Sequence, residues 1–298
     1  MGLGSARGDA SAARLALSAD GSTRIWAGPN HSGQAIDTSY AQIAADVLGR
    51  PYEEIEVIIG DTELVPDAGS CAASRSTYMG GSAVKLACEE LMERVRELGL
   101  PEPIDWAEAG RRLGGMGKAL VESRFVLPDV TEGLSREKVE KLSPHLVYGS
   151  AAMVARVEVN ELTGEVVVRS VASAVDCGVA VNPAGVIGQT EGGVVQGMGW
   201  AVMEDYIVEG GTPKTKSLET YLVPTVADAP EMDTILVEGG DPTGPFGAKG
   251  IAEVVIVPPA PAIVSAIRDA VGVTVERLPA TPERVYRLMR DAAVEAAS

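Results

Sequence analysis

A ten-residue stretch, residues 244–253, constrains this chain more than any other segment. Its sequence is Gly-Pro-Phe-Gly-Ala-Lys-Gly-Ile-Ala-Glu, and four apolar residues follow it directly. Glycines this closely spaced let the backbone adopt conformations closed to other residues and approach a ligand closely. Glu253 is expected near the first turn of the helix that follows, where the helix dipole favours an ionised carboxylate. The stretch favours a backbone cradle beside a candidate general base. A tight turn followed by an ordinary helix start would explain the same residues.

Hairpin and helix signals alternate along the chain. Alternating apolar residues flank Asp20-Gly21, and a second such pair of runs flanks residues 161–164, which predicts two β-hairpins. Each hairpin precedes a predicted helix, the first capped by Asp37 and the second by Asn182-Pro183. Because hairpin, polar loop and helix recur at residues 15–48 and 152–202, an internal duplication is one interpretation. The predicted fold is α+β, with hairpin-built mixed sheets and packed helices in two pseudo-equivalent lobes, residues 1–145 and 146–298.

Charge and cysteine content exclude several classes of protein. The net charge of −17 predicts repulsion from nucleic acid and from anionic membrane surfaces. The sequence contains no run of about 18 apolar residues, so a membrane span is not expected. The first residues also lack the apolar core of a secretory signal. Three scattered cysteines argue against a disulfide framework and favour the cytoplasm. With two histidines and no Cys-x-x-Cys, an iron–sulfur or zinc site built by this chain alone is not expected.

Three further segments combine glycine with amide or hydroxyl side chains. Residues 31–34 are His-Ser-Gly-Gln, residues 72–76 are Ala-Ala-Ser-Arg-Ser, and residues 188–199 are Gly-Gln-Thr-Glu-Gly-Gly-Val-Val-Gln-Gly-Met-Gly. Consecutive amides and hydroxyls form anion-binding concavities, and Arg75 adds a charge suited to a phosphate. In the simpler interpretations, the Gln34 amide forms hydrogen bonds within its own loop, and residues 72–76 form a Ser-rich helix cap. Each glycine in a helix costs roughly 1 kcal/mol relative to alanine, which is tolerated where something packs close to the backbone.

These four segments, taken in order, resemble the xanthine dehydrogenase and aldehyde oxidase family of molybdenum hydroxylases. The resemblance runs from about Leu15 to Met289 and implies the fold of that family's molybdopterin-binding domain. Ala35 departs from the family pattern, since a second glycine is expected there. The resemblance implies that the cofactor is held by Ser32, Gly33, Gln34, Ala73, Ser74, Arg75, Ser76 and Gln189. Ala73 would pack beside the molybdenum, and no residue of the chain is expected to ligate it.

The resemblance also gives Glu253 the role of base. In that family the glutamate removes a proton from a hydroxyl on molybdenum. The resulting oxygen nucleophile attacks an electron-poor carbon while hydride passes to a sulfido ligand. The implied function is a molybdopterin-binding subunit that hydroxylates an N-heteroaromatic substrate with water, as in xanthine or nicotinate dehydrogenase. Aldehyde or carbon monoxide oxidation is the enzymatic alternative, and a non-catalytic glycine-rich scaffold or nucleotide-binding module is the alternative of another class.

Partners are implied as well. Full-length relatives carry, before the point where the match begins, a further molybdenum-domain segment with the substrate pocket. We expect a second molybdenum subunit to supply that segment, and iron–sulfur and FAD subunits to take up the electrons. The expected cofactor is molybdenum–molybdopterin, in the cytosine dinucleotide form that bacterial relatives usually carry.

Overall fold

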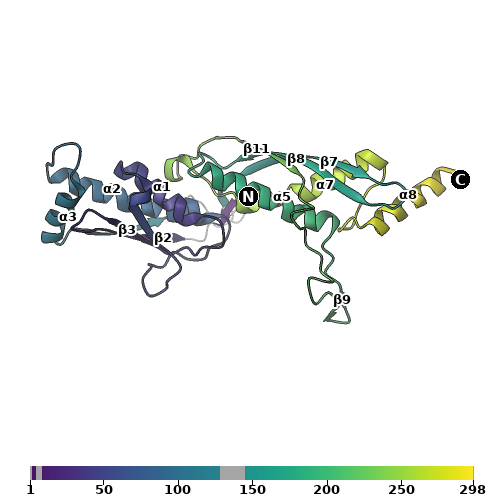
Figure 1. Cartoon of the computed structure of the whole chain (residues 1–298), viewed down its shortest axis with the longest axis horizontal. Helices are drawn as coiled ribbons and strands as arrows, with labels where there is room; N and C mark the ends of the chain where they lie inside the picture. The colour runs from purple at the N-terminus through teal and green to yellow at the C-terminus, as the bar shows by residue number, and fades with distance from the viewer. Residues whose placement is uncertain (1, 5–8, 128–144, 298) are drawn as a thin grey trace, which may run out of the picture. The chain divides into compact units, whose positions relative to one another are not determined.

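The chain folds into two compact units that share its length unevenly (Figure 1). The computed structural model describes residues 2–4, 9–127 and 145–297. Unit 1 comprises Met1–Gly149, Cys177–Gly185 and Glu238–Gly250, and unit 2 comprises Ser150–Asp176, Val186–Val237 and Ile251–Ser298. The predicted lobe boundary after residue 145 lies close to the first change of unit. Two later segments nevertheless belong to unit 1.

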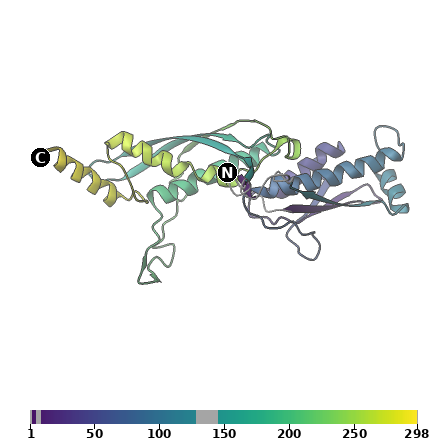
Figure 2. The same ribbon diagram turned by 180° about the vertical axis from the view of Figure 1, so that it is seen from behind.

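Unit 1 is a four-stranded sheet with helices on one face (Figures 1 and 2). Its sheet order is β4-β3-β2-β5, with bounds Ile55–Ile58, Thr23–Ala27, Ala10–Leu17 and Leu120–Val126. β2 and β3 form the predicted hairpin, and β4 runs parallel to β3. Alternate residues of β2 face inward, as a half-buried strand requires. They pack with α1 (Ile36–Leu48) and α2 (Gly81–Glu97) in one apolar cluster. The unit also contains α3 (Trp106–Gly115) and the strand pair β1 (Gly2–Gly4) and β6 (His145–Tyr148).

Unit 2 is a three-stranded sheet whose core lies against two helices. Its sheet order is β11-β8-β7, with bounds Glu231–Leu236, Val166–Asp176 and Ser150–Val159. β7 and β8 form the second predicted hairpin, and β11 runs parallel to β8. Apolar residues of β8 pack with α5 (Pro183–Val202) and α7 (Pro259–Val271). The unit also contains α6 (Ala252–Ile256), α8 (Pro282–Ala297) and a small hairpin of β9 (Val208–Glu209) and β10 (Thr212–Pro213).

Ala252–Val271 is long and apolar enough, by length and composition alone, to cross a membrane. In the structure Val257 and Pro258 separate its two helices, α6 and α7, and Pro259 is the first residue of α7. Ile263 and Ile267 are fully buried in the apolar cluster of unit 2. Packing within the unit therefore accounts for part of the apolar character of this stretch, of whose most apolar window 33% is buried.

The two units repeat one order of elements. A hairpin, a helix and a strand parallel to the second hairpin strand occur as β2-β3-α1-β4 and again as β7-β8-α5-β11. Ligands of sheets with parallel strands usually bind beyond the carboxyl ends of those strands. Four loops leave these ends, at residues 28–35, 59–75, 177–182 and 237–251. All four lie wholly or almost wholly in unit 1, including the two that follow strands of unit 2.

One predicted helix cap is wrong and another is confirmed. α1 begins at Ile36, after a cap residue, Ala35, in the left-handed conformation (φ 54°, ψ 41°). Asp37 lies inside the first turn because the chain turns into the helix earlier than predicted, and there its carboxylate suits the helix dipole. At the other predicted cap, Asn182 Oδ1 accepts a hydrogen bond of 3.0 Å from the Gly185 N–H.

Candidate functional site

The loop between β3 and α1 is organised by its own side chains. Gln34 Oε1 accepts hydrogen bonds from the Ser32 N–H (2.6 Å) and the Ser32 hydroxyl (3.0 Å). Its Nε2 donates to the Asn30 carbonyl at 3.0 Å. The Gly33 N–H donates to His31 Nδ1 at 3.0 Å. Gln34 therefore holds the shape of this loop, as the plain interpretation of the sequence expected, and presents the loop as a preformed turn.

Arg75 has a different role from the one that its charge suggested. The side chain is only 6% exposed and forms an ion pair with Asp9, with 2.7 Å between Nη2 and Oδ1. Its Nε also donates to Asp9, and the remaining N–H groups donate to the carbonyls of Ala10, Ala68 and Ser70. All five N–H donors of the guanidinium thus have partners inside unit 1. The side chain therefore braces the loop from within unit 1.

The backbone beside Arg75 is strained. Ala73 and Ser74 have φ values of 55° and 52°. Left-handed conformations cost a non-glycine residue roughly 1–2 kcal/mol. Among the described residues, Ala35 and Phe246 are the other non-glycine residues with positive φ, and both lie in the loops that leave the sheets. Such strain gathers at functional sites, where the surrounding structure maintains it. An irregular π-helical turn, Ser76–Gly80, follows and leads into α2.

The glycine-rich loop of residues 238–250 packs directly on this strained segment within unit 1. A Cβ at Gly250 would lie 1.8 Å from the Ser74 carbonyl oxygen, so only glycine fits. The Tyr78 hydroxyl donates to Thr243 Oγ1 at 2.6 Å. Burial raises the pKa of Tyr78, so the phenol remains a neutral donor. Two segments that the sequence indicated separately, residues 72–76 and 244–250, therefore meet backbone to backbone.

A further loop, residues 177–182, contacts residues 244–250, and the sequence did not predict this contact. We call residues 72–76, 177–182 and 244–250 together the loop cluster. The Val179 N–H donates to the Gly247 carbonyl at 3.0 Å, and the Lys249 N–H donates to the Cys177 carbonyl at 2.8 Å. A Cβ at Gly178 would lie 2.1 Å from the Gly247 oxygen. The only sequence signal was the glycine itself, because the segment has no periodic pattern.

In unit 2, Gln189 lies on α5 and Glu253 lies on α6, and these two helices pack closely against each other. A Cβ at Gly193 would meet Val255 at 2.8 Å, and one at Gly197 would meet Pro259 at 2.7 Å. These glycines let α5 approach α6 and the start of α7 closely, as the sequence predicted. Gln189 lies one turn before Gly193 on α5, and its side chain is half-buried. Glu253 is in the first turn of α6, half-buried, with its Oε2 oxygen shielded from solvent.

Comparison with known proteins shows which family this chain belongs to. Residues 1–230 match the molybdopterin cofactor-binding domain. The chain belongs to this family. This molybdopterin-binding chain is 30% identical to a probable xanthine dehydrogenase subunit of Bacillus subtilis over an alignment of 307 positions, which covers 95% of this chain and 40% of that protein. The aldehyde oxidoreductase of Desulfovibrio gigas has a TM-score of 0.84 and 29% identity, covering 97% of this chain and 31% of that one. The quinoline 2-oxidoreductase of Pseudomonas putida has a TM-score of 0.81 and 26% identity, covering 95% of this chain and 38% of that one.

These comparisons confirm the predicted family and α+β fold. They also show that this molybdopterin-binding chain spans two fifths or less of the length of the relatives above.

The residues of unit 1 fit a phosphate-bearing pterin. Such a group needs backbone donors, hydroxyls and positions at which it can approach the main chain. The left-handed pair Ala73 and Ser74 begins a turn that includes the Ser76 hydroxyl, and successive N–H groups in such turns bind anions. At Gly33 an added Cβ would meet no atom of the described residues within 4 Å, so one side of the turn has space for a close approach to the main chain. The loop cluster is therefore chemically suited to the cofactor of its family.

Proposed function

We propose that this chain is the molybdopterin-binding subunit of a molybdenum hydroxylase that oxidises an N-heteroaromatic compound with water. One observation carries the proposal: the loop of residues 244–250 packs on Ser74 through Gly250 and leads within three residues to Glu253. Relatives named for xanthine and quinoline favour a heterocyclic substrate. The similarity to an aldehyde oxidoreductase supports aldehyde oxidation as the second candidate.

The loops of unit 1 and the start of α5 would hold the cofactor. The turn of Ser32, Gly33 and Gln34 would contact the pterin, as would the Gln189 amide. Ala73, with its small side chain, would lie beside the metal. The backbone and hydroxyls of Ser74 and Ser76 would bind the phosphate, and Arg75 would fix the loop that presents them. When bound, molybdenum–molybdopterin, here proposed as the cytosine dinucleotide, supplies the two-electron redox chemistry.

Glu253 would act as the general base by accepting a proton at its carboxylate. A base of this kind must be ionised at neutral pH and largely shielded from water. Glu253 lies in the first turn of α6, and its Oε2 is shielded from solvent. Gly193 lets Val255 pack closely against α5, which fixes the position of α6, the helix that carries Glu253.

A complex of several subunits would complete the enzyme, in the cytoplasm. The relatives above are about two and a half to three times longer than this chain. A second molybdenum polypeptide would supply the remaining part of the substrate pocket. Iron–sulfur and FAD subunits would receive the electrons.

The test uses the intact complex, purified through a tag on this chain and analysed for molybdenum. Purines, nicotinate and aldehydes are then screened for reduction of a dye. We expect Glu253→Gln to lower turnover by about 10²–10⁴-fold, the range of general base catalysis, with molybdenum content unchanged. Glu283→Gln is the matched control, because Glu283 is also a first-turn glutamate, on α8, and is exposed. Full turnover in Glu253→Gln would remove this residue from the mechanism, and a complex without molybdenum would refute the cofactor.

A further inference from the structure

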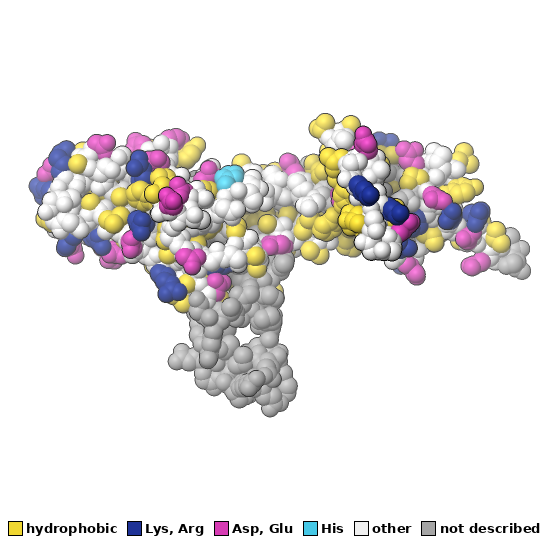
Figure 3. Space-filling view, turned by 90° about the horizontal axis from the view of Figure 1, so that it is seen from below, with side chains coloured by type: hydrophobic (Ala, Val, Ile, Leu, Met, Phe, Trp, Pro, Cys, Tyr) yellow, Lys and Arg dark blue, Asp and Glu magenta, His cyan; other side chains and the backbone are white. Residues whose placement is uncertain are grey.

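An arm of unit 2, residues 205–228, exposes an unusual number of large apolar side chains. It leaves the end of α5 and extends away from the sheet and helices of its unit, with β9 near its tip (Figures 1 and 2). Hydrophobic side chains gather around it in the space-filling view, with basic side chains among them (Figure 3). The exposed apolar residues are Tyr206, Ile207, Val208, Leu218, Leu222, Val223 and Val226. Exposed apolar patches of this kind mark interaction sites.

The arm is ordered by local bonds. The Tyr221 hydroxyl donates to the Glu204 carboxylate, and Tyr206 stacks edge-on against Tyr221 with 6.2 Å between ring centroids. The Ile207 N–H donates to Thr215 Oγ1 at 3.0 Å. None of residues 205–228 belongs to an apolar cluster among the described residues. The arm therefore has a defined shape while its apolar side chains remain available.

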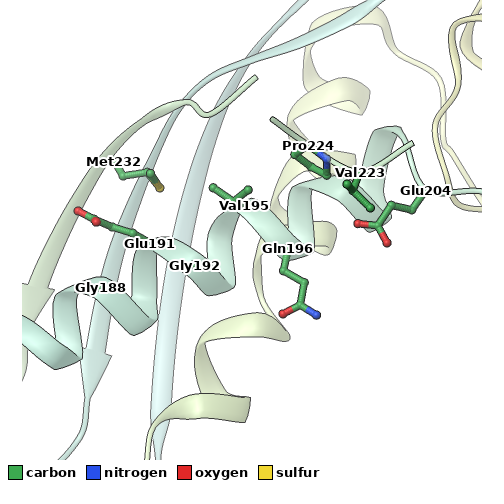
Figure 4. Close-up of a pocket in the computed structure, with 9 residues that line it drawn as sticks. All are labelled: Gly188, Glu191, Gly192, Val195, Gln196, Glu204, Val223, Pro224 and Met232. Atoms are coloured by element: carbon green, nitrogen blue, oxygen red, sulfur yellow. The ribbon is translucent and has the colours of Figure 1, made fainter. Parts of the chain in front are cut away.

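A groove of about 560 Å³ lies at the base of the arm. Figure 4 shows Glu191 and Met232 on one side of it, Val195 between, and Glu204 with Val223 and Pro224 on the other. Gly188 and Gly192 of α5 also line it. A Cβ at either glycine would meet no described atom within 4 Å, so neither glycine is required by packing within the described chain. The groove thus joins apolar walls, two carboxylates and an open helix backbone.

We infer that the arm and this groove dock the second molybdenum polypeptide, through a segment that combines apolar side chains with a lysine or arginine. The inference rests on the proposed function and adds the surface by which the two polypeptides meet. Apolar residues of the segment cover Leu222, Val223 and Val226. Its basic residue pairs with Glu191 or Glu204 in the groove, and its backbone approaches α5 at Gly188 and Gly192.

The length of the relatives favours this occupant over others. In the B. subtilis relative, 40% of the protein corresponds to this chain, so the larger part must fold with it. A partner that completes a fold buries mostly apolar surface, in contrast to the more polar contacts of transient partners. The net charge of −17 opposes a second copy of this chain at a groove that already holds two carboxylates.

Site-specific photo-crosslinking in the native complex tests the inference. Benzoylphenylalanine replaces Val226, which is 94% exposed, or Leu162, which is 87% exposed in the turn between β7 and β8 and serves as the control. After irradiation, crosslinked peptides are identified by mass spectrometry. The expected result is a crosslink from position 226 to one polypeptide whose sequence aligns with the part of the relatives that this chain does not match. Position 162 should give no crosslink to that polypeptide.

A second measurement uses Leu222→Asp, with Leu162→Asp as the control. We expect Leu222→Asp to weaken retention of the second polypeptide by at least about tenfold on size exclusion, since a charge would enter a buried contact. Crosslinks from position 226 to an iron–sulfur subunit, a flavin subunit or a second copy of this chain would overturn the inference, as would equal crosslinking from position 162. The molybdenum content separates the two proposals. If molybdenum is present and the crosslinks go elsewhere, only the docking surface is refuted, whereas absence of molybdenum refutes the proposed function.

Discussion

The contact between Gly250 and Ser74 gives the most direct test of the loop cluster. In Gly250→Ala, the new methyl group would lie 1.8 Å from the Ser74 carbonyl oxygen and 2.5 Å from its Cβ. Cβ atoms essentially never come closer than 3.0 Å to other atoms, so the two loops would have to separate until that distance is reached. Both sides of the contact are backbone, and no rotamer change relieves it. Overpacking of this kind costs about 1–3 kcal/mol.

A cost of that size shifts the balance between packed and separated loops by about 5- to 150-fold. We therefore expect Gly250→Ala to lose most of its molybdenum in the purified complex, and to be cleaved faster by protease within residues 61–76. Gly114→Ala is the control, because a Cβ there meets no described atom within 4 Å and alanine favours the helix by up to about 1 kcal/mol. If Gly250→Ala keeps wild-type molybdenum and protease resistance, the close approach of the two loops is refuted.

Three further perturbations follow from strain, buried charge and burial. Ala35→Gly should relieve the left-handed cap of α1 and stabilise the protein by about 0.5–1 kcal/mol, after the greater freedom of unfolded glycine is counted. The melting temperature should rise by about 1–4 °C, and a fall would show that this turn is not strained. Arg75→Gln should cost about 3–5 kcal/mol in denaturant unfolding, because Asp9 loses its cation, and a loss below about 1 kcal/mol would contradict the bracing role. A thiol reagent should label exposed Cys71 rapidly at pH 8. Burial raises the pKa of Cys88, so its reactive thiolate is not formed at that pH and the reagent should not label it. Equal labelling of Cys71 and Cys88 would refute the burial of Cys88.

Local signals predicted the elements of this fold well. Both hairpins formed at their turn residues, and Asn182 caps α5 as its side chain suggested. Close packing was predicted correctly at Gly193 and Gly197 of α5, since a glycine-rich helix is weak unless another element lies against it, but Gly188 and Gly192 have no such neighbour among the described residues. The partners of Gly193 and Gly197, Val255 and Pro259, could not be read from the sequence because they lie about 60 residues further along the chain.

Long-range pairing limited what the sequence could predict about the contacts at the candidate site. Arg75 looked like a phosphate ligand because its neighbours are serines, but its ion pair is formed with Asp9, 66 residues away. Nothing local distinguishes a guanidinium that binds a ligand from one that binds a distant carboxylate. Residues 177–182 were missed for the same reason, since an aperiodic loop gives no indication of the loop that it will contact. The cofactor-binding and catalytic roles given to all the site residues, Arg75 and Glu253 among them, stay predictions.

The interleaved course of the chain has a consequence for experiments that dissect it. The polypeptide passes from one unit to the other at residues 149/150, 176/177, 185/186, 237/238 and 250/251. A fragment that ends at residue 149 would lack the partners of Tyr78 and Ser74, which are supplied about 165 residues later in the chain. A cut at residue 149 therefore removes contacts that belong to unit 1. During synthesis, the strained turn at Ala73 and Ser74 must wait for the ribosome to deliver residues 238–250 before it is supported.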